Sequence, residues 1–201
     1  ISKSGQREHT GPLSGVRILD LTTVVMGPYA TMILSNLGAD IIKLEPPSGD
    51  IMRHVGPMKN ELMGHSFINA NHGKRSIVLD LKKPQARSVA LKIAKHSDVF
   101  VHNIRPAALE RLGLDYDSIA AVNPRIIFAS AVGFGSGGRY SGKPAYDDLI
   151  QGIVGVPTLM HENGGEKPRY VPTPIADRSV GLYLSSMISA AFADALSPSG
   201  W

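Results

Sequence analysis

The sequence predicts a doubly wound, Rossmann-like α/β domain built on a parallel sheet. Short apolar runs alternate along the chain with segments of helical spacing, which is the pattern of strands joined by crossover helices. Hydrophobic residues make up 43% and charged residues 19% of the 201 residues, as in ordinary globular proteins. A chain of this size buries roughly 70% of its unfolded surface, so it can form a core without covalent crosslinks.

Five runs rich in Val, Ile and Leu are expected to be the strands. Their residues are apolar at nearly every position, which is typical of strands covered by helices on both faces. Ser14 and Gly15 precede the first run, and Pro46 ends the second. The five predicted strands are residues 16–21, 41–45, 76–81, 98–101 and 125–132.

Helices are expected between and after these strands. Gly38 stands where a C-cap glycine is expected, and Pro84 stands at a helix start before apolar residues at helical spacing. The predicted helices are residues 29–37, 84–94, 107–112, 117–122, 146–154 and 179–195. Residues 46–73 and 155–175 are expected to be irregular connections. Five glycines within residues 133–144 predict a mobile loop or one that approaches a ligand.

The overall charge limits the classes of partner. The formal net charge of +4 suits an anionic ligand but is far below the dense basic tracts of a nucleic-acid-binding protein. No window approaches about 18 consecutive apolar residues, so no membrane span is expected. Residues 1–11 are polar and are expected to be a loose leader. Neither nucleic acid nor a membrane is therefore an expected partner.

Cysteine and histidine content bears on redox chemistry and metals. The absence of cysteine excludes disulfides, thiolate metal sites and cysteine nucleophiles. It fits a reducing compartment, and a cytoplasmic location is expected, with a mitochondrial or peroxisomal one left open. The seven histidines do not form a His-Glu-x-x-His pair or another metal-ligand pattern, so no metal site is expected.

Gly133, Gly135 and Gly138 match the dinucleotide pattern G-x-G-x-x-G after a predicted strand. That pattern requires a helix to start immediately, so that its amides meet a pyrophosphate. The sequence that follows contains no helix start, so a nicotinamide site is disfavoured. A phosphate-binding P-loop is excluded because Pro144 stands where that motif needs Ser or Thr.

Seven segments in consistent order and spacing resemble the class III CoA-transferases of the formyl-CoA and carnitine CoA-transferase type. They are residues 12–22, 27–50, 73–84, 98–116, 123–138, 144–155 and 175–192. The resemblance implies that residues 12–192 form the N-terminal part of the CoA-binding large domain, and that two chains interlock as a homodimer. Family members are about twice this length, and residues 193–201 depart from the family pattern.

The resemblance assigns the catalytic role to Asp177. In the family, an aspartate attacks the thioester of a donor acyl-CoA, and aspartyl anhydride and aspartyl-CoA thioester intermediates follow. The expected substrates are an acyl-CoA and a small carboxylic acid, with no permanently bound cofactor. From its local sequence alone, Asp177 precedes a predicted helix and is better interpreted as an N-cap.

The resemblance also implies contacts to coenzyme A near the ends of the third and fourth strands. The implied residues are Leu79, Leu81, Lys82, Asn103, Ile104, Arg111 and Leu112, with Arg105, Lys74 and Arg75 as auxiliaries. The carboxyl ends of parallel strands are where such sheets bind ligands. For Lys82 and Arg111 the alternative is a solvated charge at a helix end.

Several positions depart from the formyl-CoA transferase pattern. Val25 replaces a glutamine near the reacting centre, Pro46 replaces an arginine, and Pro144 replaces a lysine, with Lys143 adjacent. These differences argue against simple formyl and oxalate specificity. Val25 is still expected to lie at the substrate site.

Tyr146 stands where the related α-methylacyl-CoA racemases carry a proton-transferring histidine. An unperturbed tyrosine, with a pKa of about 10, is a poor base at neutral pH, so transfer is favoured over racemisation. Tyr146 is thus expected at the ligand site. Two alternatives stay open, an acyl-CoA racemase or epimerase and a non-catalytic CoA-binding fragment.

Overall fold

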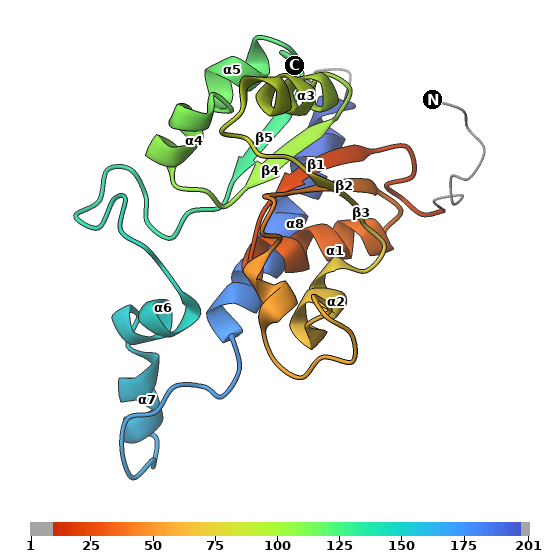
Figure 1. Cartoon of the computed structure of the whole chain (residues 1–201). Coiled ribbons are helices and arrows are strands. Elements are labelled where there is room, and N and C mark those ends of the chain that lie inside the picture. Colours follow the sequence, from red (N-terminus) through yellow and green to blue (C-terminus); the bar gives the residue numbers. More distant parts are fainter. Residues whose placement is uncertain (1–9, 198–201) are drawn as a thin grey trace.

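The computed structural model describes residues 10–197 and contains one parallel five-stranded sheet (Figure 1). The strands lie in the order β3-β2-β1-β4-β5, and every neighbouring pair is parallel. Their bounds are β1 Arg17–Leu21, β2 Asp40–Glu45, β3 Arg75–Val78, β4 Val99–His102 and β5 Ile127–Ser130. The predicted doubly wound α/β fold is confirmed. The direction of winding reverses between β1 and β4, which is where such sheets bind ligands.

Helices cover both faces of the sheet. Along the chain they are α1 Met26–Asn36, the 3₁₀ helix η1 Ile51–His54, α2 His65–Asn71, α3 Pro84–Ala94, α4 Pro106–Leu112, α5 Tyr116–Ala120, α6 Asp147–Ile153, α7 Val156–Glu162 and α8 Ile175–Ala195. Helices α1 and α8 pack against one another and cover one face, while α3, α4 and α5 contribute to the core on the other. Figure 1 shows α6 and α7 projecting away from the sheet.

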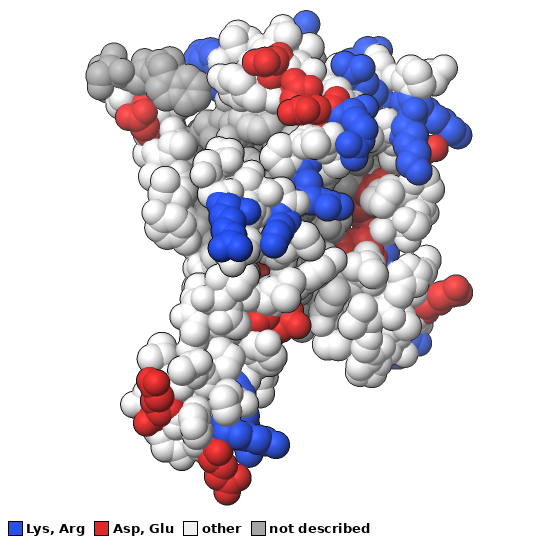
Figure 2. All heavy atoms as spheres, turned by 90° about the vertical axis from the view of Figure 1, so that its left-hand side faces the viewer, with Lys and Arg blue, Asp and Glu red and all other residues white. Residues whose placement is uncertain are grey.

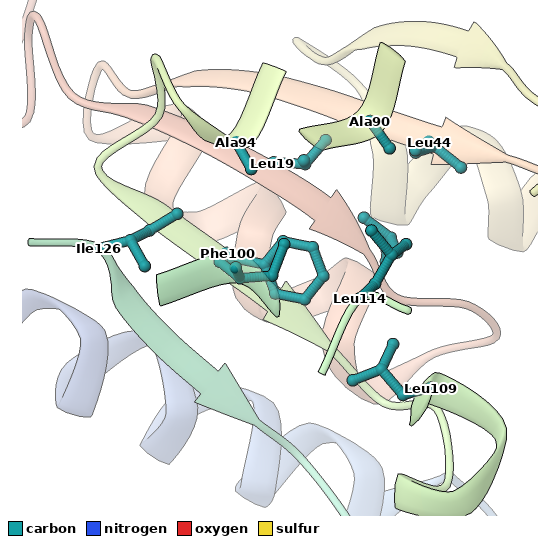
Figure 3. Packing of buried hydrophobic residues seen from close by; sticks show 10 residues of the cluster. Leu19, Leu44, Ala90, Ala94, Phe100, Leu109, Leu114 and Ile126 are labelled. Atoms are coloured by element: carbon teal, nitrogen blue, oxygen red, sulfur yellow. The ribbon is translucent and has the colours of Figure 1, made fainter. Parts of the chain in front are cut away.

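The core consists of two clusters because successive residues of each strand point to opposite faces. Leu19 and Phe100 belong to the cluster that packs under α3, α4 and α5 (Figure 3). Ile18 and Val101 belong to the other cluster, which includes Ile188 of α8. Burial on both faces explains why the strand sequences are apolar at nearly every position.

Several predicted boundaries and connections need correction. Strand β3 ends at Val78, three residues before the predicted end, because Asp80 starts a turn in which its side chain accepts the backbone N–H of Lys82. Residues 46–73 were expected to be irregular but contain η1 and α2, and residues 155–175 contain α7. In α7, Pro157 is the second residue of the helix and does not break it, because the first turn needs no intrahelical N–H from proline.

Helix α8 begins four residues earlier than residue 179, the predicted start. Pro174 occupies the N-cap position, and Asp177 lies within the first turn. The interpretation of Asp177 as an N-cap is therefore wrong.

The expected leader, residues 1–11, lies almost entirely outside the described residues, and so does part of the expected divergent end, residues 193–201. Helix α8 ends at Ala195. Among residues 10–197, no helix combines the length and apolar character required to span a bilayer.

Candidate active site

A cavity of about 660 Å³ lies at the carboxyl ends of β1, β4 and β5. Met26 follows β1, Asn103 follows β4 and Ala131 follows β5, and all three line the cavity together with the first turns of α8. This position beside the β1–β4 switch point is the one that the topology favours for a ligand. Among the residues proposed from sequence, the cavity brings together Asn103, Arg105, Arg111, Tyr146 and Asp177.

Close packing of α8 on α1 brings Asp177 to the cavity. Gly181 of α8 is buried, and a Cβ atom there would lie 2.8 Å from the carbonyl oxygen of Met26. Glycine therefore permits an approach of the two helices that any other residue would obstruct. Asp177 lies about one turn earlier on α8, and its side chain and that of Met26 line the same cavity.

The environment of Asp177 makes its carboxyl group unusually basic. Burial raises the pKa of Asp177 to about 6, and the nearby charge of Asp147 adds to the shift. Asp147 Oδ1 accepts the backbone N–H of Asp177 at 2.9 Å, so the two residues are held together at the start of α8. At pH 7 most Asp177 side chains are ionised, and they are more basic than an exposed aspartate.

A chain of side-chain hydrogen bonds holds Asp147 in position. Gln151 is buried, and its Nε2 donates to Asp147 Oδ2 at 2.5 Å. The Oε1 atom of Gln151 accepts the backbone N–H of Val171 at 2.9 Å. The segment before α8 is thereby linked to α6. The N-cap residue of α8 makes no side-chain hydrogen bond, and Asp147 of α6 instead accepts a backbone N–H of the first turn of α8.

The turn between β1 and α1 forms the wall beside Met26, and it is strained. Val24 has φ +72°, in the left-handed region that β-branched residues rarely adopt. Asn103 holds the turn, since its Oδ1 accepts the N–H of Thr23 at 3.0 Å and its Nδ2 donates to the Thr23 carbonyl at 2.8 Å. Val25 occupies the N-cap position of α1 and is partly buried next to Met26. Asn103 thus joins the two loops at the switch point.

Cationic side chains also line the cavity. Arg105 occupies the N-cap position of α4 and Arg111 lies in its last turn, and within residues 10–197 neither has an ion-pair partner. Lys143 also lines the cavity, with Nζ 4.7 Å from the centre of the Tyr140 ring. Figure 2 shows Lys and Arg side chains gathered on the face that this part of the chain presents. These cations are suited to bind phosphate groups.

The other residues proposed to contact coenzyme A do not line the cavity. Four of them are partly buried apolar side chains that pack against the core cluster under α3, α4 and α5. They are Leu79, Leu81, Ile104 and Leu112. Lys82 is exposed in the turn after β3. The structure therefore brings Asn103, Arg105 and Arg111 of the proposed set to the cavity, but not Lys82, and these four leucine and isoleucine side chains belong to the core.

The two auxiliary cations before and within β3 each form an ion pair with a carboxylate of the protein. Lys74 is buried, and its Nζ donates to Asp20 at 3.2 Å and to Thr31 at 2.7 Å. Burial lowers the pKa of Lys74 to about 8, while the charge of Asp20 opposes that shift. Arg75 forms an ion pair with Asp40 at 2.6 Å. Neither residue lines the cavity.

Sequence reasoning missed several residues of this site. Asp147 could have been predicted from the sequence, because it is one of two acidic residues in the first turn of a predicted helix. Val180 could also have been predicted, since it follows Asp177 by three residues on a helix and shares its face. Ile150 and Phe134 line the cavity without a local signal. Among the described residues, no three His, Cys, Asp or Glu side chains are grouped as metal ligands.

A basic carboxylate shares this switch-point cavity with arginines that have no ion-pair partner in the described part of the chain, which defines an α/β protein suited to an anionic ligand. The sequence profile of CoA-transferase family III matches residues 13–197, and the chain belongs to this family. The resemblance to class III CoA-transferases is thereby confirmed.

Individual relatives agree with the family assignment. The chain is 39% identical over 183 residues to the acetyl-CoA:oxalate CoA-transferase of Acetobacter aceti, covering 90% of this chain and 46% of that protein. It is 37% identical over 192 residues to a succinate–glutarate CoA-transferase of Agrobacterium fabrum, covering 92% of this chain and 48% of that protein. The chain thus spans about half the length of these curated relatives.

Solved structures give the same result for the fold. A CAIB/BAIF family protein from Brucella suis superposes with a TM-score of 0.86 and 34% identity, over 92% of this chain and 50% of that one. Rv3272 from Mycobacterium tuberculosis superposes with a TM-score of 0.83 and 32% identity over the same shares. The described part of the chain therefore has the architecture of the corresponding half of these proteins.

Proposed function

We propose that the protein transfers coenzyme A from an acyl-CoA to a carboxylic acid, with Asp177 as the nucleophile. The observation that carries the proposal is a half-buried carboxylate, with its pKa raised to about 6, in the switch-point cavity of a CoA-transferase family III chain. A carboxylate that is ionised at neutral pH and still basic is well suited to attack a thioester carbonyl.

The proposed reaction proceeds through four exchanges at carbonyl carbons. An oxygen of Asp177 bonds to the thioester carbon of the donor, and the carbon–sulfur bond breaks to release CoA thiolate and leave a mixed anhydride. The thiolate then attacks the aspartyl carbonyl and expels the donor acid, which leaves an aspartyl-CoA thioester. The acceptor carboxylate repeats these two steps in reverse, giving acceptor acyl-CoA and free Asp177. No proton is gained or lost overall.

The surrounding residues support this role. Asp147 and Gln151 fix the backbone at Asp177, so the carboxylate is held at the start of α8, where the helix amides favour developing negative charge. We assign Arg105 and Arg111 to the phosphates of coenzyme A, because both line the cavity and no carboxylate of residues 10–197 pairs with them. Tyr146 and Val25 lie at and beside the same cavity, and we expect them to contact the acyl and acceptor groups.

Chemical trapping tests the proposal. The protein is incubated with an acyl-CoA and then treated with borohydride, which reduces an aspartyl thioester, and the modified residue is mapped by mass spectrometry. We expect modification at Asp177 and a loss of transfer of at least about 10³-fold in Asp177→Asn. The control Asp194→Asn, at the exposed far end of α8, should keep full activity.

Two outcomes would contradict the proposal. Modification of another residue would assign the nucleophile elsewhere. Deuterium exchange at the substrate α-carbon without CoA transfer would establish a racemase, the alternative left open by the sequence. The homodimer and the cytoplasmic location implied by the resemblance stay predictions.

A further inference from the structure

The turn that joins β1 to α1, residues 22–25, is held through its backbone by side chains from distant parts of the chain. We call it the β1–α1 turn. Asn103, which follows β4 and lies 80 positions away, bonds to Thr23 twice. Its Oδ1 accepts the N–H of Thr23 at 3.0 Å, and its Nδ2 donates to the carbonyl at 2.8 Å. One side chain therefore fixes both polar backbone groups of the residue at the centre of the turn.

The buried ion pair of Lys43 and Asp50 holds the backbone groups on either side of Thr23. Lys43 Nζ donates to the carbonyl of Thr22 at 2.8 Å, and Asp50 Oδ1 accepts the N–H of Val24 at 3.3 Å. The two side chains lie 3.0 Å apart and are almost completely buried. Four successive polar groups of the backbone are thus bonded to side chains, so the turn has little freedom to change its conformation.

The conformation that these bonds hold is a strained one. Val24 has φ +72°, in the left-handed region where the Cβ of a β-branched residue is crowded by the backbone. Such a conformation persists only where the surrounding interactions over-determine it. Asn103 makes two of the four bonds, so we expect Val24 to return to a negative φ when the Asn103 side chain is removed.

The β1–α1 turn leads directly into the wall of the cavity that contains Asp177. Met26 lines that cavity, and its carbonyl oxygen is the atom that a Cβ at Gly181 would approach to 2.8 Å. Gly181 lies about one helical turn after Asp177 on α8. A displacement of the turn would therefore change both the cavity wall and the packing that brings Asp177 to it.

We propose that Asn103 is a positioning residue, which holds the strained β1–α1 turn so that the thioester of a bound acyl-CoA stays aligned with Asp177. The inference rests on the proposed CoA transfer and adds a residue to its machinery. It differs from the contact to coenzyme A that the resemblance implies, because both ends of the Asn103 carboxamide are already bonded to Thr23. Alignment matters for the rate, since a displacement of about 1 Å can reduce it by about 10²-fold.

The kinetics of Asn103→Ala test this role. The value of kcat for transfer from acetyl-CoA to one fixed acceptor acid should fall by at least about tenfold, because the cavity wall moves. The dissociation constant of coenzyme A, measured by calorimetry, should change by less than about twofold, because no bond to the ligand is removed. Asn103→Ser removes less volume and is measured in the same way if Asn103→Ala does not fold.

Val24→Gly provides a rescue that distinguishes positioning from direct contact. Glycine adopts a positive φ without strain, so the turn no longer has to be held against its own preference. In the Val24→Gly background, Asn103→Ala should reduce kcat by only about threefold or less, and a double-mutant cycle measures this non-additivity. A residue that bonded coenzyme A directly would cause the same loss in both backgrounds and raise the dissociation constant, which would overturn the inference.

Asn123→Ala is the matched control. Asn123 is also partly buried, and its Nδ2 donates to the carbonyls of Ala94 and Ser97 at 3.1 and 2.8 Å. These contacts lie at the end of the sheet opposite the cavity. Urea denaturation should show a comparable loss of stability in Asn123→Ala and Asn103→Ala, while kcat falls only in Asn103→Ala. An equal decrease of kcat in both variants would show that kcat follows stability, and would overturn the inference.

Crystal structures of the variants separate this inference from the proposed function. A positive φ at Val24 in Asn103→Ala would overturn the inference at any level of activity. If the wild type transfers no CoA, the proposed function fails, and a negative φ with unchanged coenzyme A binding still supports Asn103 as the residue that holds the turn. Transfer with the same kcat in the wild type and Asn103→Ala overturns the inference and leaves the proposed function standing.

Discussion

Two groups of charged residues lie on either side of the turn between β1 and α1, and they differ in how their charges are balanced. In the first group, Lys43 pairs with Asp50 at 3.0 Å and Lys74 pairs with Asp20 at 3.2 Å, and all four side chains are almost fully buried. Burial alone would raise the pKa of Asp20, but the charges of Lys74 and Lys43 keep it below its ordinary value.

In the second group, around the cavity, Arg105 and Arg111 have no acidic partner among the described residues, and Asp177 has the acidic neighbour Asp147. A buried charge without its partner is costly, so the first group is complete within the protein. Arg105 and Arg111 of the second group are exposed and are therefore available to an anionic ligand. We expect a cation of this fold to bind a ligand where the nearby carboxylates do not pair with it.

The largest expected effect is the removal of a cation from the buried group. Lys74→Met leaves Asp20 buried without its main partner, so we expect the free energy of unfolding to fall by about 3–5 kcal/mol. Urea denaturation measures it. The neighbouring Arg75→Met removes an exposed partner of Asp40 and should cost about 1 kcal/mol or less. An equal decrease in the free energy of unfolding for the two variants would show that burial of an ion pair does not determine how much the pair contributes to stability.

A cation of the cavity should affect ligand binding and not stability. Arg111→Ala should weaken coenzyme A binding by about 1.5–3 kcal/mol, the range for a hydrogen bond to a charged group. Unfolding free energy should change by about 0.5 kcal/mol or less, as for an exposed side chain. Calorimetric titration with coenzyme A at two salt concentrations measures the binding.

The control for this experiment is Arg125→Ala. Arg125 is exposed just before β5, at the end of the sheet opposite the cavity, and should bind coenzyme A as the wild type does. A fall in stability for Arg111→Ala with unchanged binding would place Arg111 among the structural charges.

The sheet could be predicted from sequence because the strands are buried on both faces. Leu19 and Ile18 point to opposite clusters and are both apolar, so the run around them is distinctive. Helices α2 and α7 were missed since each has only seven residues, too few for a clear apolar stripe. For such short elements the fold, and not the local sequence, determines the structure.

The candidate site was predictable only in part. Asn103 and Arg111 follow β4, and parallel sheets bind ligands at the carboxyl ends of their strands. This was enough to predict that both residues lie at the cavity. No local pattern distinguishes Lys74, which the fold buries beside Asp20, from a cation that faces a ligand. The proximity of Asp147 and Asp177, which are 30 positions apart, depends on how α6 packs against α8, and this packing has no sequence signature.

The smallest expected effect concerns the pKa of Asp177. Burial and the charge of Asp147 raise this pKa, so the reactive carboxylate forms as the pH increases through about 6, and wild-type kcat/KM should rise over the same range. Asp147→Asn removes the neighbouring charge, and its amide oxygen can still accept the Asp177 N–H. The acid limb should therefore move to lower pH, while burial keeps the pKa of Asp177 above its ordinary value.

The raised pKa of Asp177 also changes how the free energy of unfolding depends on pH, and this can be measured independently of catalysis. The pKa of Asp177 is higher in the folded protein than in the unfolded chain, so ionised Asp177 destabilises the fold above pH 6 and has no such effect below its unfolded pKa. Asp147→Asn should reduce this loss, measured as unfolding free energy at pH 4 and pH 7. Asp148→Asn changes an exposed neighbour and should alter neither profile. An acid limb that stays in place in Asp147→Asn would mean that burial alone sets the reactivity of Asp177.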